Sequence, residues 1–356
     1  MKIQRVPTRA VKVGGVTIGG SAPISVQTMT NTPTEDVEAT RAQLKELEQA
    51  GAELVRVSVP TEAAALALPA LVASVSIPIV ADIHFNWKLA IASIEAGVAK
   101  IRINPGTIGP KHAVRDIITA ARDHGVAIRI GLNAASLPRE YRAEGRTKGL
   151  LDAARAWVAF FEDLEFFDIV VSAKASSVRE TIEVYRALAS ELSYPLHVGV
   201  TEAGTAFSGS IKSAVALGVL LEEGIGDTIR VSLSADPRLE VRAGIEILKS
   251  LGLLEGPELV SCPTCARAEI DVISLAEAVE SKLAAIRIPL TVAVMGCAVN
   301  GPGEAREADV GLAGSARGIL LFKKGVIVRT VSPEEALDAL LAEIETIVRE
   351  KESQAE

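Results

Sequence analysis

Short runs of β-branched and other apolar residues alternate with longer, more polar stretches through the first two-thirds of the chain. The runs lie at residues 24–28, 54–59, 79–82, 100–103, 127–130, 168–172, 196–200 and 228–232. The stretches between them are rich in Ala, Leu and Glu and long enough for helices, for example 34–49, 86–96 and 150–165. Glycines such as Gly51 and Gly125 lie where these helices should end. The pattern predicts strands that are each followed by a helix.

Strands and helices that alternate in this way predict a parallel sheet, because each helix returns the chain to the same end of the sheet. Eight repeats without a reversal or linker favour a closed (β/α)8 TIM barrel over an open doubly wound sheet. No G-x-G-x-x-G sequence follows a strand, which argues against a dinucleotide site. The pairs Gly14-Gly15 and Gly19-Gly20 precede the first repeat and predict turns of an N-terminal hairpin.

The repeating pattern ends near Gly256-Pro257, where we place a domain boundary. The remainder predicts strands at 258–261, 290–295, 310–313, 319–322 and 326–330, with helices over 269–285 and from Pro333 onward. The predicted fold class is therefore α/β, with a TIM barrel over residues 1–255 and a small α+β domain over 256–356.

The composition is that of a soluble globular protein and excludes several classes of function. The 356 residues are 49% hydrophobic, 23% charged and 3% aromatic, with a net charge of −8. Such a chain lacks the basic surface and stacking aromatics of a nucleic-acid binder. The start has no apolar signal segment, and the most apolar window, 63–80, is interrupted by Pro69 and Pro78. We therefore expect no membrane segment and a cytoplasmic location.

Polar side chains gather where the predicted strands end. Alternate residues of a strand point to the same side, and reactive groups of a TIM barrel lie at the carboxyl ends of its strands. The polar residues at these ends are Arg56, Ser58, Asp82, His84, Arg102, Asn104, Arg129, Asn133, Ser172, Lys174, His197, Glu202, Arg230, Ser232 and Ser234. A single strand Arg is more often a surface or ion-pair residue, but several strands share this feature here. Because buried unpaired cations are costly, the pattern predicts a phosphorylated small-molecule substrate, and several cations suit two phosphates.

Glu202 is the candidate acid–base residue, because it follows a strand and precedes Gly204 at the expected mouth of the barrel. A helix-capping or surface carboxylate is the alternative. His84 and His197 fit a metal ligand, a general acid or a core imidazole, and neither lies in an H-x-x-x-H spacing. Their roles, like that of Asp82, stay open.

The three cysteines all lie in the second domain, as the C-x-x-C pair Cys262 and Cys265 and as Cys297. A C-x-x-C sequence by itself fits zinc, an iron–sulfur cluster or a redox disulfide. A thioredoxin-like site would leave Cys297 without a role. A structural zinc site needs four ligands, and no histidine follows His197.

Three thiolates suit a [4Fe–4S] cluster whose fourth iron is held by a weaker ligand. Glu304 is the candidate, because the glycines and proline of segment 301–303 would fold the loop back toward Cys297. A carboxylate on iron is labile and would leave a position for a substrate oxygen. The alternative is three unrelated buried cysteines.

Segments in fixed order along nearly the whole chain match one family. They begin at Ser25 (SVQTMTNT), Ala81 (ADIHF), Arg102 (RINPG), Arg129 (RIGLN), Val200 (VTEAG), Arg230 (RVSLSADP), Cys262 (CPTCAR) and Met295 (MGCAVNGPGE). On these segments the chain resembles the 4-hydroxy-3-methylbut-2-enyl diphosphate synthase family of the non-mevalonate isoprenoid pathway, in its short bacterial form.

The resemblance implies reductive ring opening and dehydroxylation of 2-C-methyl-D-erythritol 2,4-cyclodiphosphate to the linear allylic diphosphate. The implied ligands of a [4Fe–4S] cluster are Cys262, Cys265, Cys297 and Glu304, with Glu304 giving way to the substrate. The implied diphosphate-binding residues are Arg56, Arg102, Arg129 and Lys174, assisted by Asn133 and Ser232. Glu202 matches a residue that transfers a proton. The resemblance also implies reduced flavodoxin or ferredoxin as electron donor and a head-to-tail homodimer.

Two other functions stay open from the residues alone. One is a barrel lyase or synthase that acts on a phosphorylated or pterin-like ligand, with a structural metal such as zinc in the second domain. The other is a non-enzymatic iron–sulfur sensor or scaffold. Iron and sulfide content distinguishes an iron–sulfur enzyme from the lyase or synthase. Reductant-dependent turnover distinguishes it from the sensor or scaffold.

Overall fold

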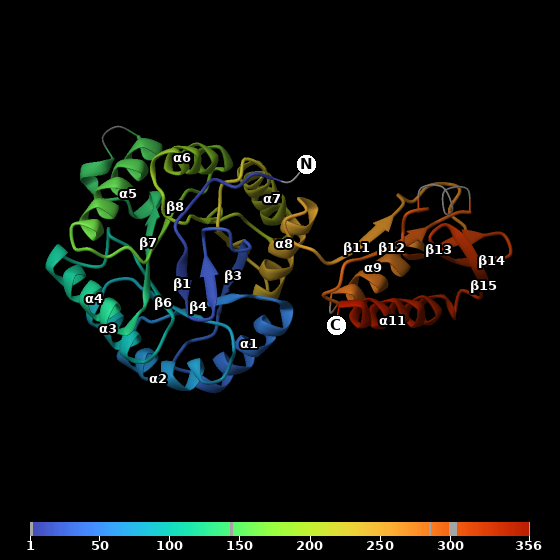
Figure 1. The fold of residues 1–356 in the computed structure, drawn as a ribbon, viewed down its shortest axis with the longest axis horizontal. Coiled ribbons are helices and arrows are strands. Elements are labelled where there is room, and N and C mark those ends of the chain that lie inside the picture. Colours follow the sequence, from blue (N-terminus) through green and yellow to red (C-terminus); the bar gives the residue numbers. More distant parts are fainter. Residues whose placement is uncertain (1–2, 143–144, 285, 299–304, 356) are drawn as a thin grey trace. The chain divides into compact units, whose positions relative to one another are not determined.

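The chain forms two units, which we describe separately from a computed structural model (Figure 1). The structure describes residues 3–142, 145–284, 286–298 and 305–355. The units are Met1–Leu254 and Glu255–Glu356. This division lies one residue before the boundary expected where the strand–helix pattern ends.

The first unit is a parallel barrel, which confirms the predicted TIM fold. Its strands are β3 (Ser25–Met29), β4 (Leu54–Ser58), β5 (Ile79–Ile83), β6 (Lys100–Ile103), β7 (Ala127–Asn133), β8 (Ile169–Lys174), β9 (His197–Val198) and β10 (Thr228–Ile229). Their order in the sheet is β8-β7-β6-β5-β4-β3-β10-β9. A parallel bridge between Val171 and Leu196 brings the two ends of the sheet together, so the barrel is nearly closed.

Strands β9 and β10 are shorter than the predicted runs at 196–200 and 228–232. Past their ends the two segments stay close, because Arg230 donates its backbone N–H to Val198 O at 3.0 Å. Gly199, which follows Val198, has no side chain to pack on the sheet, and the hydrogen-bond ladder between the two strands ends there.

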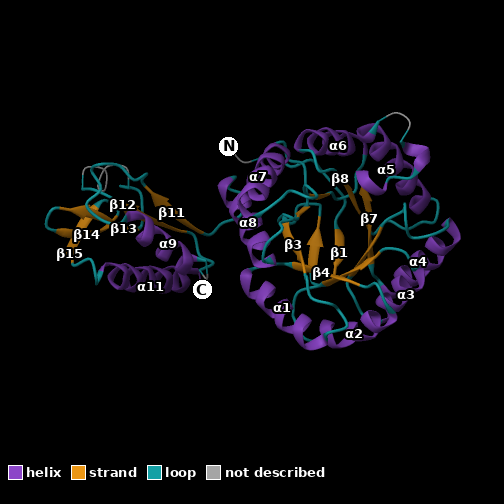
Figure 2. Ribbon diagram, turned by 180° about the vertical axis from the view of Figure 1, so that it is seen from behind, coloured by secondary structure: helices purple, strands orange, loops and turns teal. Residues whose placement is uncertain are grey.

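Helices surround the strands on the outside of the barrel (Figures 1 and 2). They are α1 (Val37–Ala50), α2 (Glu62–Val72), α3 (Trp87–Glu95), α4 (Lys111–His124), α5 (Arg146–Glu162), α6 (Val178–Glu191), α7 (Ala206–Glu222) and α8 (Pro237–Ser250). Helix α1 begins later than the predicted 34–49, because the Asp36 side chain caps it by accepting from Ala39 N at 3.1 Å. Gly51 and Gly125 end α1 and α4 in the left-handed conformation, as predicted.

The apolar core of this unit lies between the strands and the helices. Outward-facing strand residues such as Val57, Ile101 and Ile128 pack in one cluster with helix residues such as Leu68 and Ile117. The inward-facing residues toward the carboxyl ends of the strands are largely polar. The interior of the barrel therefore depends on polar contacts for its stability.

The predicted N-terminal hairpin covers the amino-terminal end of the barrel. Its strands β1 (Val11–Val13) and β2 (Val16–Ile18) are antiparallel and are joined by a turn in which Gly14 has φ 58°. Their apolar side chains form a cluster with Leu54, Val80 and Val170 at the starts of barrel strands. This cluster leaves the carboxyl end as the open face of the barrel.

The second unit is a five-stranded sheet with helices packed on it. The strands are β11 (Pro257–Ser261), β12 (Leu290–Met295), β13 (Val310–Ser315), β14 (Gly318–Lys323) and β15 (Val326–Val331), in that order in the sheet. The first three are parallel, and β14 and β15 are antiparallel to their neighbours. Helices α9 (Val272–Leu283) and α11 (Ala336–Ala355) share an apolar core with the sheet. Asp271 caps α9, which is shorter than the predicted 269–285.

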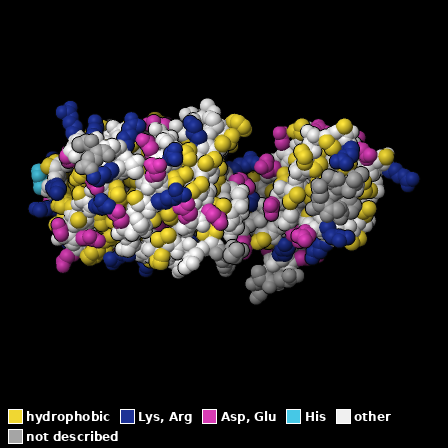
Figure 3. All heavy atoms as spheres, turned by 90° about the horizontal axis from the view of Figure 1, so that it is seen from above, with side chains coloured by type: hydrophobic (Ala, Val, Ile, Leu, Met, Phe, Trp, Pro, Cys, Tyr) yellow, Lys and Arg dark blue, Asp and Glu magenta, His cyan; other side chains and the backbone are white. Residues whose placement is uncertain are grey.

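The surface differs in charge from the interior of the barrel. Basic and acidic side chains are interspersed over the visible face of both units (Figure 3). None of the described helices is long and apolar enough to cross a membrane. Inside the barrel, by contrast, cations outnumber carboxylates among the described residues, as shown below.

Candidate active site

Cationic side chains from several strands converge inside the barrel. They are Arg56, Lys100, Arg102, Arg129, Lys174 and Arg230. Lys100 and Arg129 are fully buried. Burial, followed by the charges of neighbouring cations, holds the pKa values of Lys100, Arg129 and Lys174 well below their usual values. These shifts indicate an interior that carries more positive charge than its own carboxylates neutralise.

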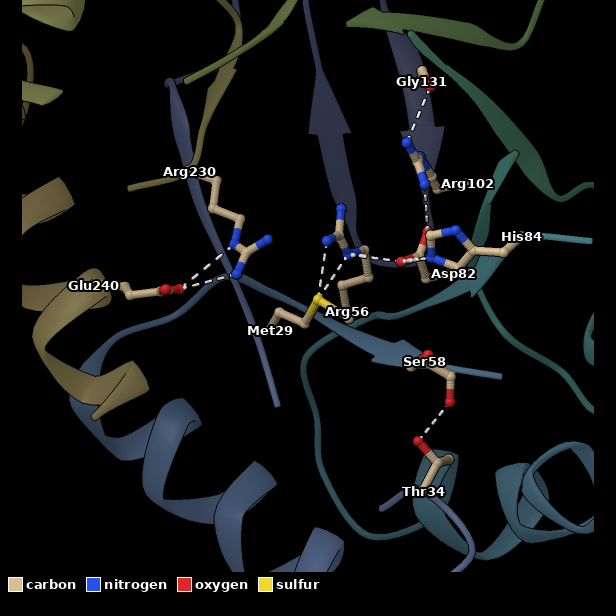
Figure 4. Close-up of polar contacts among 10 residues, drawn as sticks. All are labelled: Met29, Thr34, Arg56, Ser58, Asp82, His84, Arg102, Gly131, Arg230 and Glu240. Carbon is tan, nitrogen blue, oxygen red and sulfur yellow. Dashed lines mark hydrogen bonds and ion pairs between the residues drawn. The ribbon is translucent and has the colours of Figure 1, made fainter. Parts of the chain in front are cut away.

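Asp82 lies at the centre of this group, on the inward side of β5 (Figure 4). Its carboxylate accepts a hydrogen bond from Arg102 Nη1 at 3.2 Å and lies 3.0 Å from His84 Nε2. Arg56 Nε is 3.6 Å away. Burial by itself would raise the pKa of Asp82, but Arg56, His84 and Arg102 together hold it well below its usual range. Asp82 therefore stays ionised and fixes the positions of two guanidinium groups.

Beyond Asp82, Arg56 and Arg102 contact only neutral groups among the described residues. Arg56 directs Nε and Nη2 at the Met29 sulfur, at 3.1 and 2.9 Å, and a thioether is a weak acceptor. Arg102 donates from Nη2 to Gly131 O at 3.0 Å, and its Nε has no partner among the described residues. Both groups thus retain N–H donors for a stronger acceptor such as phosphate.

Arg230 follows β10 and joins the same group. Its Nε and Nη2 lie 3.4 Å from Glu240 Oε2 on α8 (Figure 4). Glu240 is itself fixed by Thr28 Oγ1 at 2.9 Å and by Leu233 N at 2.9 Å. Burial and the charge of Arg56 lower the pKa of Arg230 to about 10 despite Glu240. The long contacts leave this guanidinium only partly neutralised.

Two glycines make room for the cations. A side chain at Gly131 would place its Cβ 2.3 Å from Arg102 Nε. A Cβ at Gly199 would lie 2.3 Å from Arg230 O and 3.0 Å from Lys174 Nζ. Each glycine therefore allows a cation to lie against the strand backbone.

Glu202 lies at the edge of a pocket of about 390 Å³ at the carboxyl end of the barrel. Arg230, Ser232, Ser234 and Glu240 also line this pocket. Glu202 is exposed, and its φ of 55° is in the left-handed region, which is unfavourable for a residue with a side chain. Strain of this kind is concentrated at functional sites. The pocket thus combines two carboxylates, several hydroxyls and a guanidinium.

Asn133 ends β7, and Lys174 is its register partner at the end of β8. Asn133 Oδ1 accepts from Ala135 N at 3.0 Å, which caps a short 3-10 turn, Ala134–Ser136. This bond leaves the amide N–H2 as the part of Asn133 that is suited to an anionic ligand.

His197 is fully buried, and burial followed by the charge of Arg129 holds its pKa well below the usual value.

The cysteines lie at one edge of the second unit, where β11 and β12 end side by side. Cys262 follows β11, and its Sγ accepts the backbone N–H of Gly296 at 3.1 Å. Cys297, the next residue, is buried, whereas Cys265 is exposed. The N–H groups of Arg267 lower the pKa of Cys265. The edge therefore has three thiol donors, one of them favoured as thiolate.

The three cysteine sulfurs fit an iron–sulfur cluster chemically, but the described side chains do not form a complete set of four ligands. Among described residues, no three His, Cys, Asp or Glu side chains gather closely enough to hold a metal ion. Glu304, the predicted fourth ligand, lies outside the described residues.

Several residues of this interior were not among the predicted site residues. Arg230 belongs to a strand-end motif but was left out of the predicted substrate-binding set. Lys100 lies at the start of a predicted strand and Glu240 on a predicted helix, so neither position suggested the barrel interior. The period-two spacing of Lys100 and Arg102 on one strand is the signal that could have identified the lysine.

Comparison with known proteins assigns both units to one family. Residues 8–245 match the GcpE TIM-barrel domain, and residues 258–346 match the GcpE protein C-terminal domain. A relative from Caldanaerobacter subterraneus is 53% identical over 348 residues, which are 97% of this chain and 98% of its own length. One from Bacillus mycoides is 50% identical over 357 residues, 99% and 98% of the two chains. Both are named 4-hydroxy-3-methylbut-2-en-1-yl diphosphate synthase (flavodoxin).

A solved structure that is similar in fold covers about two-thirds of the chain. Dihydropteroate synthase from Stenotrophomonas maltophilia, with active site-bound imidazole, covers 69% of this chain and 97% of its own, with a TM-score of 0.53 and 16% identity. At that identity the likeness shows the fold and nothing about the ligand. The family matches cover both units, and the relatives are half identical over nearly their full length. The resemblance drawn from the motifs is thereby confirmed, and the chain belongs to the GcpE family.

Proposed function

We propose that this chain forms 4-hydroxy-3-methylbut-2-en-1-yl diphosphate by reductive ring opening of 2-C-methyl-D-erythritol 2,4-cyclodiphosphate. The relatives' names support this reaction. The structural observation that carries it is the cation-lined interior of the barrel in a chain whose net charge is −8. Family membership sets aside the barrel lyase and the non-enzymatic sensor.

The barrel would bind the diphosphate through N–H donors that its own carboxylates leave unused. Asp82 orients Arg56 and Arg102, and Glu240 orients Arg230, before substrate arrives. Arg129 and Lys174 add charge, with Asn133 and Ser232 as neutral donors at the same end. Preorganised donors of this kind need little rearrangement on binding, which favours both affinity and orientation.

The cluster domain would supply the electrons. We assign a [4Fe–4S] cluster to Cys262, Cys265, Cys297 and Glu304. The placement of Cys262 and Cys297 after the neighbouring strands β11 and β12 supports that ligand set. When bound, the cluster delivers two electrons to the substrate. Because iron is held by thiolate, the lowered pKa of Cys265 favours its role as a ligand.

The partners follow from the same assignment. Flavodoxin is the donor in the relatives' names, and ferredoxin is the alternative. We propose a head-to-tail homodimer in which the cluster domain of one chain covers the barrel of the other. A cytoplasmic location, expected from the reduced thiols, stays a prediction.

The reaction also needs protons, because the hydroxyl leaves as water. Two electrons and two protons convert the cyclic diphosphate to the linear product and one water. Glu202 is the proposed proton donor, because it lies in the same pocket as Arg230 and Ser232. Its strained backbone holds the carboxylate at the pocket edge.

Arg102→Ala is expected to weaken binding of the cyclodiphosphate by about 2 kcal/mol, a rise in Kd of roughly 30-fold, because a charge-assisted bond to phosphate is lost. Calorimetric titration of the full chain without reductant measures it. Arg115→Ala, an exposed arginine on α4, is the matched control and should bind normally. An unchanged Kd for Arg102→Ala would remove this residue from the phosphate site.

Glu202→Gln is expected to lower kcat by roughly 100-fold or more while leaving the substrate Kd unchanged, because the amide keeps the shape but cannot donate a proton. Steady-state turnover and calorimetry separate the two effects. Glu222→Gln, on the exposed side of α7, is the control. Normal turnover of Glu202→Gln would exclude the proton-transfer role.

Metal analysis of the anaerobically purified chain tests the cluster assignment. We expect about four irons and four sulfides per chain and no stoichiometric zinc. Zinc in place of iron would contradict the proposal, whatever the barrel binds.

A further inference from the structure

A second polar group lies inside the barrel, nearer to the N-terminal hairpin. Lys100 and Gln27 each lie two residues before a residue of the site described above on the same strand, Arg102 and Met29. Thr228 on β10 lies two residues before Arg230, which follows that strand. Residues two apart point the same way, so these side chains face the same interior one step lower. His197 is the register partner of Thr228 on the neighbouring strand. We call Gln27, Lys100, His197 and Thr228 the lower tier.

The lower tier is completely buried and unsatisfied. Exposure is 1% for Gln27 and 0% for Lys100, His197 and Thr228. Lys100 Nζ, both His197 ring nitrogens, both Gln27 amide atoms and Thr228 Oγ1 have no hydrogen-bond partner among the described residues. Nε and Nη1 of Arg129, whose charge acts on both Lys100 and His197, also lack a partner among the described residues. Buried polar groups are almost always hydrogen-bonded to protein, ligand or ordered water, so this tier calls for partners beyond the described side chains.

The chemistry of the tier favours an anion over water alone. Lys100 and the free Arg129 nitrogens are donors only, whereas Gln27, His197 and Thr228 can each donate as well as accept a hydrogen bond. Within the described ranges, neither Lys100 nor Arg129 forms an ion pair with a carboxylate. The charges that act on Lys100 are those of Arg129 and Arg56, both cations. Asp82 and Glu240 are already engaged by Arg56, Arg102 and Arg230.

Size limits the ligand to one atom or a few. The interior of an eight-stranded barrel is just wide enough for side chains to fill. Leu54 and Val80, the register partners of Gln27 and Lys100, belong to the apolar cluster of the hairpin and lie beside the tier.

We propose that the lower tier holds a small inorganic anion of the halide class, with bridging water, between Lys100, His197 and Arg129. This anion is a resident ligand of the barrel, separate from the substrate, and does not depend on the reaction proposed above. It supplies the counter-charge that Lys100 lacks and so stabilises the folded barrel. A bound halide also fixes the lower side of the Arg129 guanidinium.

Bromide in crystals of the full-length holoenzyme gives the direct test. We expect an anomalous difference peak within hydrogen-bond distance of Lys100 Nζ in the wild-type protein. The peak should vanish in Lys100→Met and persist in Lys212→Met, a control on the exposed face of α7. Water without anomalous signal in the tier, or bromide at surface lysines as an adventitious ion only, would overturn the proposal.

Thermal unfolding of the holoenzyme gives a second test that needs no crystal. At constant ionic strength, replacing gluconate with chloride should raise the wild-type Tm saturably, by a few degrees, because the halide binds only the folded state. Lys100→Met is the control for non-specific effects of chloride and gluconate on the Tm, and its Tm should not rise saturably with chloride. If that variant does not fold, His197→Gln takes its place. A wild-type Tm without saturable chloride dependence would contradict a resident halide.

Discussion

Replacing Asp82 with asparagine is expected to lower the free energy of unfolding by about 3 kcal/mol, because removal of one partner from a buried ion pair leaves uncompensated charge. Asp82 is 1% exposed and neutralises both Arg56 and Arg102. Asparagine has the same shape, so no cavity forms. Equilibrium urea unfolding of the anaerobic full chain measures the loss. Asp123→Asn, on the exposed face of α4, is the control and should be near neutral.

The stability difference between the wild type and Asp82→Asn should depend on pH in a defined direction. Despite burial, Arg56, His84 and Arg102 hold the pKa of folded Asp82 below its ordinary value. A group with a depressed folded pKa contributes stability above its unfolded pKa and loses it as pH falls. The difference in free energy of unfolding between wild type and Asp82→Asn should therefore be largest at neutral pH and decrease below about pH 4. A gap that is absent, or that widens in acid, would show that Asp82 is not the counter-charge.

Cys297→Ser is expected to lose the iron and all turnover while leaving the substrate Kd unchanged. Cys297 is buried two residues after the end of β12, so serine fits the same space, but a hydroxyl is a poor ligand for iron in a cluster. Iron and sulfide content, with calorimetric titration of the cyclodiphosphate, separates the two units' contributions. Ser261→Ala changes the same sheet edge without removing a thiol and should keep its iron. Full iron content in Cys297→Ser would exclude this cysteine as a ligand.

The fold could be predicted from local patterns because its elements repeat. Strand β6 is found exactly at the predicted 100–103, and β12 at 290–295. Helix starts were less accurate where two capping residues compete: Thr34 precedes α1, but its hydroxyl donates to Ser58 O at 2.6 Å and leaves Asp36 as the cap (Figure 4).

The interior contacts could be predicted only in outline. Period-two spacing places Arg56, Asp82 and Arg102 on one side of the sheet, but the pairing of Asp82 with both arginines depends on strand register. Glu240 is oriented in part by Thr28 on β3, a long-range contact between α8 and β3 that has no sequence signal. The left-handed backbone of Glu202 is likewise invisible, since nothing in its neighbours requires it.

Turnover of the cyclodiphosphate by the anaerobic full chain with reduced flavodoxin tests the central claim most directly. Phosphorus NMR distinguishes the cyclic substrate from the linear diphosphate. We predict that the linear product forms only when the donor is reduced, with two electrons consumed per product. A chain that carries its full iron, binds the cyclodiphosphate and still leaves it unchanged with reduced donor would contradict the proposed function.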